Sequence, residues 1–92
     1  MNIEKYTNTD YIPNQNTRSE IESLNKQKQN LSNFHLPKAE LEKVYLVDAK
    51  MQNSNLSKAN LTNASLYGID LSGSNLFKAN FECPPINIGT GL

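Results

Sequence analysis

The chain has 92 residues, and its nine Lys and Arg side chains balance nine Asp and Glu side chains. This length allows one domain, and a neutral chain lacks the overall electrostatic attraction that draws proteins to nucleic acid or anionic lipid. Only 37% of the residues are hydrophobic, the mean hydropathy is −0.60 and there is one cysteine, which argues against a membrane span, an internal disulfide and a cysteine-based zinc site.

Residues 1–16 show no regular spacing of apolar side chains. Their larger side chains stand among Asn and Thr residues, namely Tyr6, Tyr11, Ile12 and Pro13. We therefore expect an irregular arm rather than part of a hydrophobic core. The first residues also lack the apolar stretch of a secretory signal peptide, so we expect a cytoplasmic protein.

A short helix is predicted next. Residues 17–20 (TRSE) match a capping box, in which the Thr and Glu side chains satisfy the first free N–H groups of a helix. We expect the helix over residues 18–28, with Ile21 and Leu24 on one face.

From residue 31 onward, a large apolar residue recurs every five residues. A second series, mostly small or apolar, stands two residues before the first. The first series is Leu31, Leu36, Leu41, Leu46, Met51, Leu56, Leu61, Leu66, Leu71, Leu76 and Phe81. Spacings of two and then three fit no helix face and no continuous strand, but they do fit a short extended step followed by a corner. A chain that turns the same way every five residues winds into a coil.

Three segments show the repeat most clearly: residues 58–62 (KANLT), 63–67 (NASLY) and 78–82 (KANFE). They resemble the A-(N/D)-L-x-x unit of pentapeptide-repeat proteins, and the resemblance covers about residues 29–83. It implies an all-β solenoid, a right-handed quadrilateral parallel β-helix of about three coils, in which four pentapeptides make one coil of 20 residues. The expected organisation is an N-terminal arm and capping helix (1–28), the repeat domain (29–83) and a C-terminal tail or end cap (84–92).

Both ends of such a coil need protection, because its last edge and its core leucines would otherwise be exposed. The helix over residues 18–28 is expected to cap Leu31 and Leu36, and the alternative is a docking helix for another protein. At the other end, Pro84 and Pro85 remove two backbone donors, so pairing should stop at or after Cys83.

The second series departs from small residues at four positions, namely Gln29, Phe34, Val44 and Ile69. Phe34 and Ile69 are large enough to require local widening of the coil or a cap nearby. Beyond the prolines, Ile86 and Ile88 are expected to fold across the open end.

Catalytic groups are sparse. His35 occupies an outward position, and Glu40 and Glu42 flank Leu41 as a surface carboxylate pair that would ordinarily be solvated. Gly68 and Gly73 fall at corners, so they indicate turns rather than a phosphate-binding loop. We therefore expect no enzymatic activity, no cofactor and no metal site.

Lys38, Lys58 and Lys78 share one outward position in successive coils. They would form a ladder of positive charges about 5 Å apart. The ladder is interpreted either as solvated lysines that prevent edge aggregation or as a stripe for an anionic partner. It is too short, and too diluted by acids, to indicate direct nucleic-acid binding.

Outward apolar residues are the stronger signal for binding. Tyr45, Val47 and Tyr67 should gather on one side, as a patch of the kind that marks interaction sites. The alternative is that the N-terminal arm covers them with Tyr11 and Ile12. Phe77 is a weaker further candidate.

The expected function is a non-enzymatic protein–protein interaction or scaffold module with an unidentified protein partner and no membrane association. A homodimer through one end of the solenoid is left open as a further interaction. The alternative is a DNA-mimicking inhibitor or protector of a type II topoisomerase or another DNA-binding enzyme, as some members of the family are. The repeat region is neutral and under three coils long, however, whereas those members are long and acidic.

Overall fold

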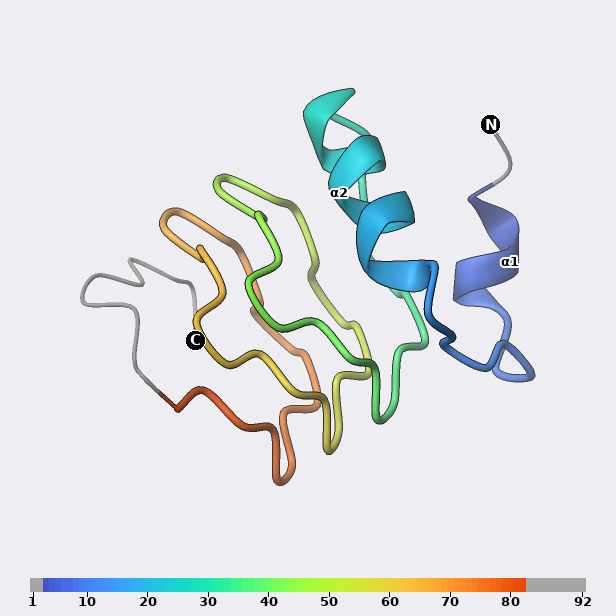
Figure 1. The fold of residues 1–92 in the computed structure, drawn as a ribbon. Helices are drawn as coiled ribbons and strands as arrows, with labels where there is room; N and C mark the ends of the chain where they lie inside the picture. The colour runs from blue at the N-terminus through green and yellow to red at the C-terminus, as the bar shows by residue number, and fades with distance from the viewer. Residues whose placement is uncertain (1–2, 83–92) are drawn as a thin grey trace.

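The computed structural model describes residues 3–82. Two helices come first, α1 (Glu4–Thr7) and α2 (Thr17–Lys26), and the repeat region follows them as a stack of coils (Figure 1). No helix in this part of the chain is long and apolar enough to cross a membrane. The expectations for Cys83, Ile86, Ile88 and the tail 84–92 fall outside the described residues.

Successive coils pair through residues that are 20 positions apart. Tyr45 forms a parallel bridge with Ser65, and five more bridges between residues 35 and 80 have the same offset. On this side, Leu46 N–H donates to the Ser65 carbonyl at 2.9 Å, and Ser65 N–H donates back to the Val44 carbonyl at 2.8 Å. Residues 3–82 contain isolated bridges rather than continuous strands, because the chain turns again before a longer extended segment can form.

Each corner of the coil has one residue in the left-handed conformation, at the second position after each large apolar residue. Gly68 and Gly73 occupy it with φ values of 74° and 72°, as expected for turns. The other occupants are not glycine: Asn33, Lys38, Lys43, Asp48, Asn53, Lys58, Asn63 and Lys78 all have φ between 59° and 66°. A left-handed backbone costs roughly 1–2 kcal/mol for a residue with a Cβ atom, and the turn hydrogen bond, such as Ala59 N–H to the Leu56 carbonyl at 3.0 Å, offsets part of it.

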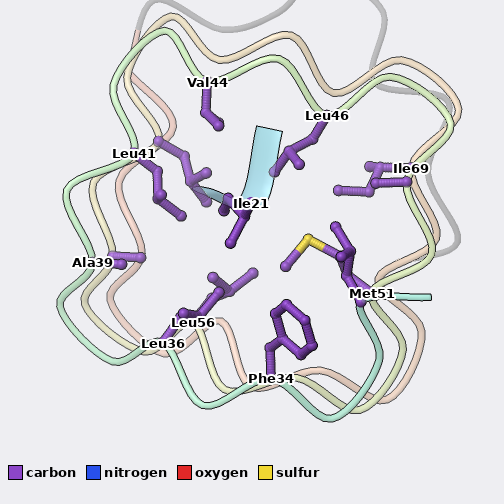
Figure 2. Packing of buried hydrophobic residues seen from close by; sticks show 14 of the residues in the cluster. Ile21, Phe34, Leu36, Ala39, Leu41, Val44, Leu46, Met51, Leu56 and Ile69 are labelled. Carbon is purple, nitrogen blue, oxygen red and sulfur yellow. The ribbon is translucent and has the colours of Figure 1, made fainter. Parts of the chain in front are cut away.

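The large apolar series fills the interior, as the spacing predicted. Every member from Leu31 to Leu71 is buried, whereas Leu76 and Phe81 in the last described coil are half-buried. Figure 2 shows five members of the series pointing inward from a four-sided outline, namely Leu36, Leu41, Leu46, Met51 and Leu56. The inclusion of Gln29 in the inner series was wrong: its side chain is exposed, and its N–H bonds the Leu24 carbonyl at 3.0 Å, so it belongs to the turn that follows α2.

Phe34 is accommodated beneath a cap, at a corner where a serine hydroxyl replaces the direct turn hydrogen bond. At its corner the Ser54 hydroxyl accepts a hydrogen bond from Phe34 N–H and donates one to the Leu31 carbonyl, both at 3.2 Å. The Ser74 hydroxyl bridges the next corner of this column in the same way. The Tyr6 ring stacks on the Phe34 ring, with centroids 4.9 Å apart.

The expectation that residues 1–16 stay outside the core was wrong for Tyr6. Its side chain is only 3% exposed and belongs to the core cluster. Its hydroxyl donates to Glu20 of α2 at 2.5 Å, and the Tyr11 ring packs edge-on against it. Tyr6 is buried because the open first coil offers the exposed face of Phe34, which a local pattern within residues 1–16 cannot reveal.

The capping box was also wrong in detail. Thr17 is the first helical residue, and Asn16 precedes it without a side-chain cap. The Thr17 hydroxyl instead accepts a hydrogen bond from Asn14 N–H at 2.8 Å and bonds the Tyr11 hydroxyl at 2.7 Å. Glu20 is engaged by Tyr6 and is therefore not available to reach back to the start of the helix.

α2 covers the open end of the first coil. Ile21 and Leu24 are fully buried, and Ile21 lies near the middle of the four-sided outline (Figure 2). Side chains of α2 also bond first-coil backbone groups that would otherwise face a preceding coil. Arg18 donates to the Glu42 carbonyl at 2.9 Å, Asn25 donates to the Val47 carbonyl at 3.1 Å, and Glu22 accepts from Tyr45 N–H at 2.8 Å.

The corner geometry predicts the effect of replacing Lys58 with glycine. Because glycine adopts the left-handed conformation without steric cost, Lys58→Gly should stabilise the protein by about 0.5–1 kcal/mol in urea unfolding. In the matched control Lys50→Gly, the residue is bridged to Asp70 rather than at a corner, so the change should destabilise by about 0.5–1 kcal/mol. Equal destabilisation by both changes would show that the corner conformation carries no strain.

The closed interior predicts that a charge at Leu61 unfolds the chain. Leu61 is 2% exposed, so Leu61→Asp buries an unpaired carboxylate at a cost of several kcal/mol, comparable to the whole stability of a small domain. Asn63→Asp, two residues away at an exposed corner, should change the melting temperature little. A Leu61→Asp protein that melts near the wild type would refute the packing.

The buried hydroxyl of Tyr6 predicts that the stability of the protein falls at alkaline pH. Burial, followed by the hydrogen bond to Glu20, raises the pKa of Tyr6 far above its ordinary value of 10.0. Above pH 10 the unfolded chain therefore releases a proton that the folded chain retains, and stability falls as the pH rises. Tyr6→Phe keeps the ring but removes this titration, so its unfolding free energy should decline less between pH 9 and 11 than that of the wild type. Parallel declines would contradict the assignment.

Candidate functional site

His35, Glu40 and Glu42 are the titratable side chains that the sequence offers as catalytic candidates. No three His, Cys, Asp or Glu residues within residues 3–82 are placed to hold a metal ion. His35 is half-buried, and its Nδ1 atom lies 3.5 Å from the Asn55 amide nitrogen in the next coil. Glu40 and Glu42 line an open groove of about 770 Å³ that also contains Arg18.

The lysine ladder forms at the corners. Lys38, Lys58 and Lys78 are exposed and left-handed, and each occupies the same position of its coil. Phe77 is 63% exposed beside the last of them, with Lys78 Nζ 5.4 Å from its ring centroid. The repeat places these four residues on one side of the stack.

Tyr45, Val47 and Tyr67 gather on another side, and we call these three residues the tyrosine patch. Tyr45 is 47% exposed and Tyr67 is 55% exposed, while Val47 is half-buried. Val47 and Tyr67 occupy equivalent positions in adjacent coils, where Asp48 N–H donates to the Tyr67 carbonyl at 2.9 Å. The patch is therefore continuous across two coils.

The N-terminal arm does not cover the tyrosine patch. Tyr11 packs against Tyr6 and bonds Thr17, while Ile12 is 79% exposed. The alternative in which Tyr11 and Ile12 shield the patch is therefore wrong. The aromatic residues of the arm are occupied by the cap, which leaves the patch open.

A second groove lies beside the patch, and we call it the α2 groove. Its volume is about 360 Å³. One wall comes from the end of α2 and the residues after it, and the other comes from the first coil. The walls are Asn25, Lys26, Lys28 and Gln29 on one side and Tyr45, Val47, Asp48 and Lys50 on the other. Sequence reasoning missed this groove because it depends on how α2 sits on the coil.

The comparison with protein families agrees with the repeating architecture. The family described as pentapeptide repeats matches residues 30–63 and 54–83, with eight copies. The chain belongs to the pentapeptide-repeat family. The matched residues of this pentapeptide-repeat protein include the whole tyrosine patch and one wall of the α2 groove. No curated protein and no solved structure gave a significant match.

Proposed function

We propose that this pentapeptide-repeat protein is a non-enzymatic interaction or scaffold module that acts in the cytoplasm. In this proposal the stack is the right-handed quadrilateral parallel β-helix typical of the family, and its sides are rigid surfaces for a partner protein. Family membership and the 20-residue pairing of coils support this geometry.

The observation that carries the proposal is the exposure of the tyrosine patch on a fixed backbone. Tyr45 N–H is held by Glu22, and the Tyr67 carbonyl is held by Asp48 N–H. Exposed aromatic residues on a preorganised surface supply contact area with little loss of conformational freedom. These side chains offer binding surface rather than the acid, base or nucleophile that catalysis requires.

DNA mimicry is the less favoured function. Imitating DNA calls for a regular row of acidic side chains. Glu40 and Glu42 do not contribute to such a row, since they share their groove with Arg18, Lys38 and Lys43.

Substitution of the patch tests the proposal. The immobilised protein should capture its partner from a lysate of the source organism, with identification by mass spectrometry and affinity measurement on the purified partner. Tyr45→Ser combined with Tyr67→Ser should weaken binding by about 100-fold, because each aromatic anchor contributes on the order of 2 kcal/mol. The melting temperature should change little, since about half of each residue's surface is exposed.

Phe77→Ser is the matched control, because it removes an exposed aromatic ring outside the patch. It should leave the affinity within about twofold of the wild type. Unchanged affinity in the double variant, or an equal loss in the Phe77 variant, would remove the tyrosine patch as the principal interface.

A further inference from the structure

We propose that the α2 groove receives an acidic segment of the partner protein. An apolar or aromatic side chain of that segment would lie against Tyr45 and Val47, and its carboxylates would reach Lys26, Lys28 and Lys50. This inference rests on the proposed function, because the groove shares Tyr45 and Val47 with the tyrosine patch. It adds the chemical character of the partner.

Positive charge in the α2 groove is not neutralised by ion pairs. Lys26, Lys28 and Lys50 line it, and all three are exposed. Within residues 3–82 the single ion pair joins Lys5 and Glu20, at 3.6 Å. The three groove lysines therefore remain available to an incoming anion, and as flexible cations they can adapt to carboxylates at different positions.

Asp48 is the one acidic residue that lines the groove. A Cβ atom added to Gly68 would lie 2.2 Å from Asp48 Oδ1, so the Asp48 carboxylate lies over Gly68 in the second coil. α2 lies on the opposite side of the first coil. The Asp48 carboxylate is thus directed toward the second coil, while Glu22 accepts from Tyr45 N–H and Asp70 accepts from Ser72.

The end of α2 does not require the lysines as caps. The last carbonyls of a helix commonly attract cations, but here the following backbone satisfies them. Gln27 N–H bonds the Ser23 carbonyl at 3.1 Å, and Lys28 N–H bonds the Asn25 carbonyl at 2.8 Å. The ammonium groups of Lys26 and Lys28 are therefore not committed to the helix terminus.

The size and surroundings of the groove favour a peptide over a nucleic acid. Its volume of about 360 Å³ is near the lower end of the range for ligand pockets, which suits a few side chains of an extended segment. Nucleic-acid binding depends on many phosphate contacts along a basic surface, whereas this chain has no net charge. Acidic side chains around one apolar residue match both the lysines and the Tyr45 wall.

Fluorescence anisotropy with a defined probe tests this inference. The probe is a fluorescein-labelled peptide with a central Leu-Trp pair flanked by two glutamates on each side. Its matched control has glutamines in place of the glutamates. We expect the acidic peptide to bind the full chain at least about tenfold more tightly than the glutamine peptide. We also expect its affinity to fall as salt is raised from about 0.05 to 0.5 M.

Two triple variants locate the binding site. Lys26→Gln, Lys28→Gln and Lys50→Gln together should weaken acidic-peptide binding by about tenfold. Lys38→Gln, Lys58→Gln and Lys78→Gln remove the same number of charges from the lysine ladder. That control should stay within about twofold of the wild type, because its lysines do not line the groove. Circular dichroism melting verifies that both variants are folded.

The outcomes separate this inference from the proposed function. Absence of acidic-peptide binding, equal binding of the glutamine peptide, or equal losses in the two triple variants would overturn the acidic-segment assignment. Tighter binding of a labelled 12-nucleotide single strand, or self-association that depends on the groove lysines, would overturn it in favour of another occupant. In each case the partner captured through Tyr45 and Tyr67 could still bind, so the proposed function would stand or fall by its own experiment.

Discussion

A left-handed residue at every fifth position is the constraint on which the rest of this structure depends. Without the corner, the chain would continue as an ordinary strand, and residues 20 apart would never come together. With it, Leu46 N–H meets the Ser65 carbonyl and Asp48 N–H meets the Tyr67 carbonyl. The same rotation brings the large side chains of the repeat to the interior. It also places one outward residue above another, and this stacking makes a patch from Val47 and Tyr67.

A stack of this kind has ends, and here its first end is completed by a different kind of structure. The first coil has no preceding coil, so side chains of α2 take the place of backbone partners, with Arg18, Glu22 and Asn25 bonding its backbone groups. Ile21 and Leu24 close the interior at the same time. One short helix thus satisfies both the polar edge and the apolar centre. The α2 groove arises where the cylindrical helix α2 lies across the four-sided first coil.

The sequence alone predicted whatever depends on the repeat. The five-residue period placed the large apolar residues from Leu31 to Leu71 in the interior and placed Gly68 and Gly73 at corners. The family comparison agrees with the repeat. The errors concern Tyr6, Thr17 and Gln29, all of which lie where the repeat meets the segment before it. Phe34, which is distant in sequence, decides the role of Tyr6. The nearby Tyr11 engages Thr17, and Leu24 at the end of α2 engages Gln29. The tyrosine patch was predictable because stacking alone creates it, whereas the α2 groove also requires the docked position of α2.

The hydrogen bonds between coils give the stack a direction. For each N–H group that bonds back to the preceding coil, as Ser65 does, two bond forward to the next coil, as Leu46 and Asp48 do. The first edge of the stack is therefore richer in carbonyl oxygens and the opposite edge is richer in N–H groups. Arg18 and Asn25 donate to the first edge, which suits its excess of acceptors. The backbone of the described coils consequently contributes a small dipole along the stacking axis, and two like edges brought face to face would oppose groups of the same kind.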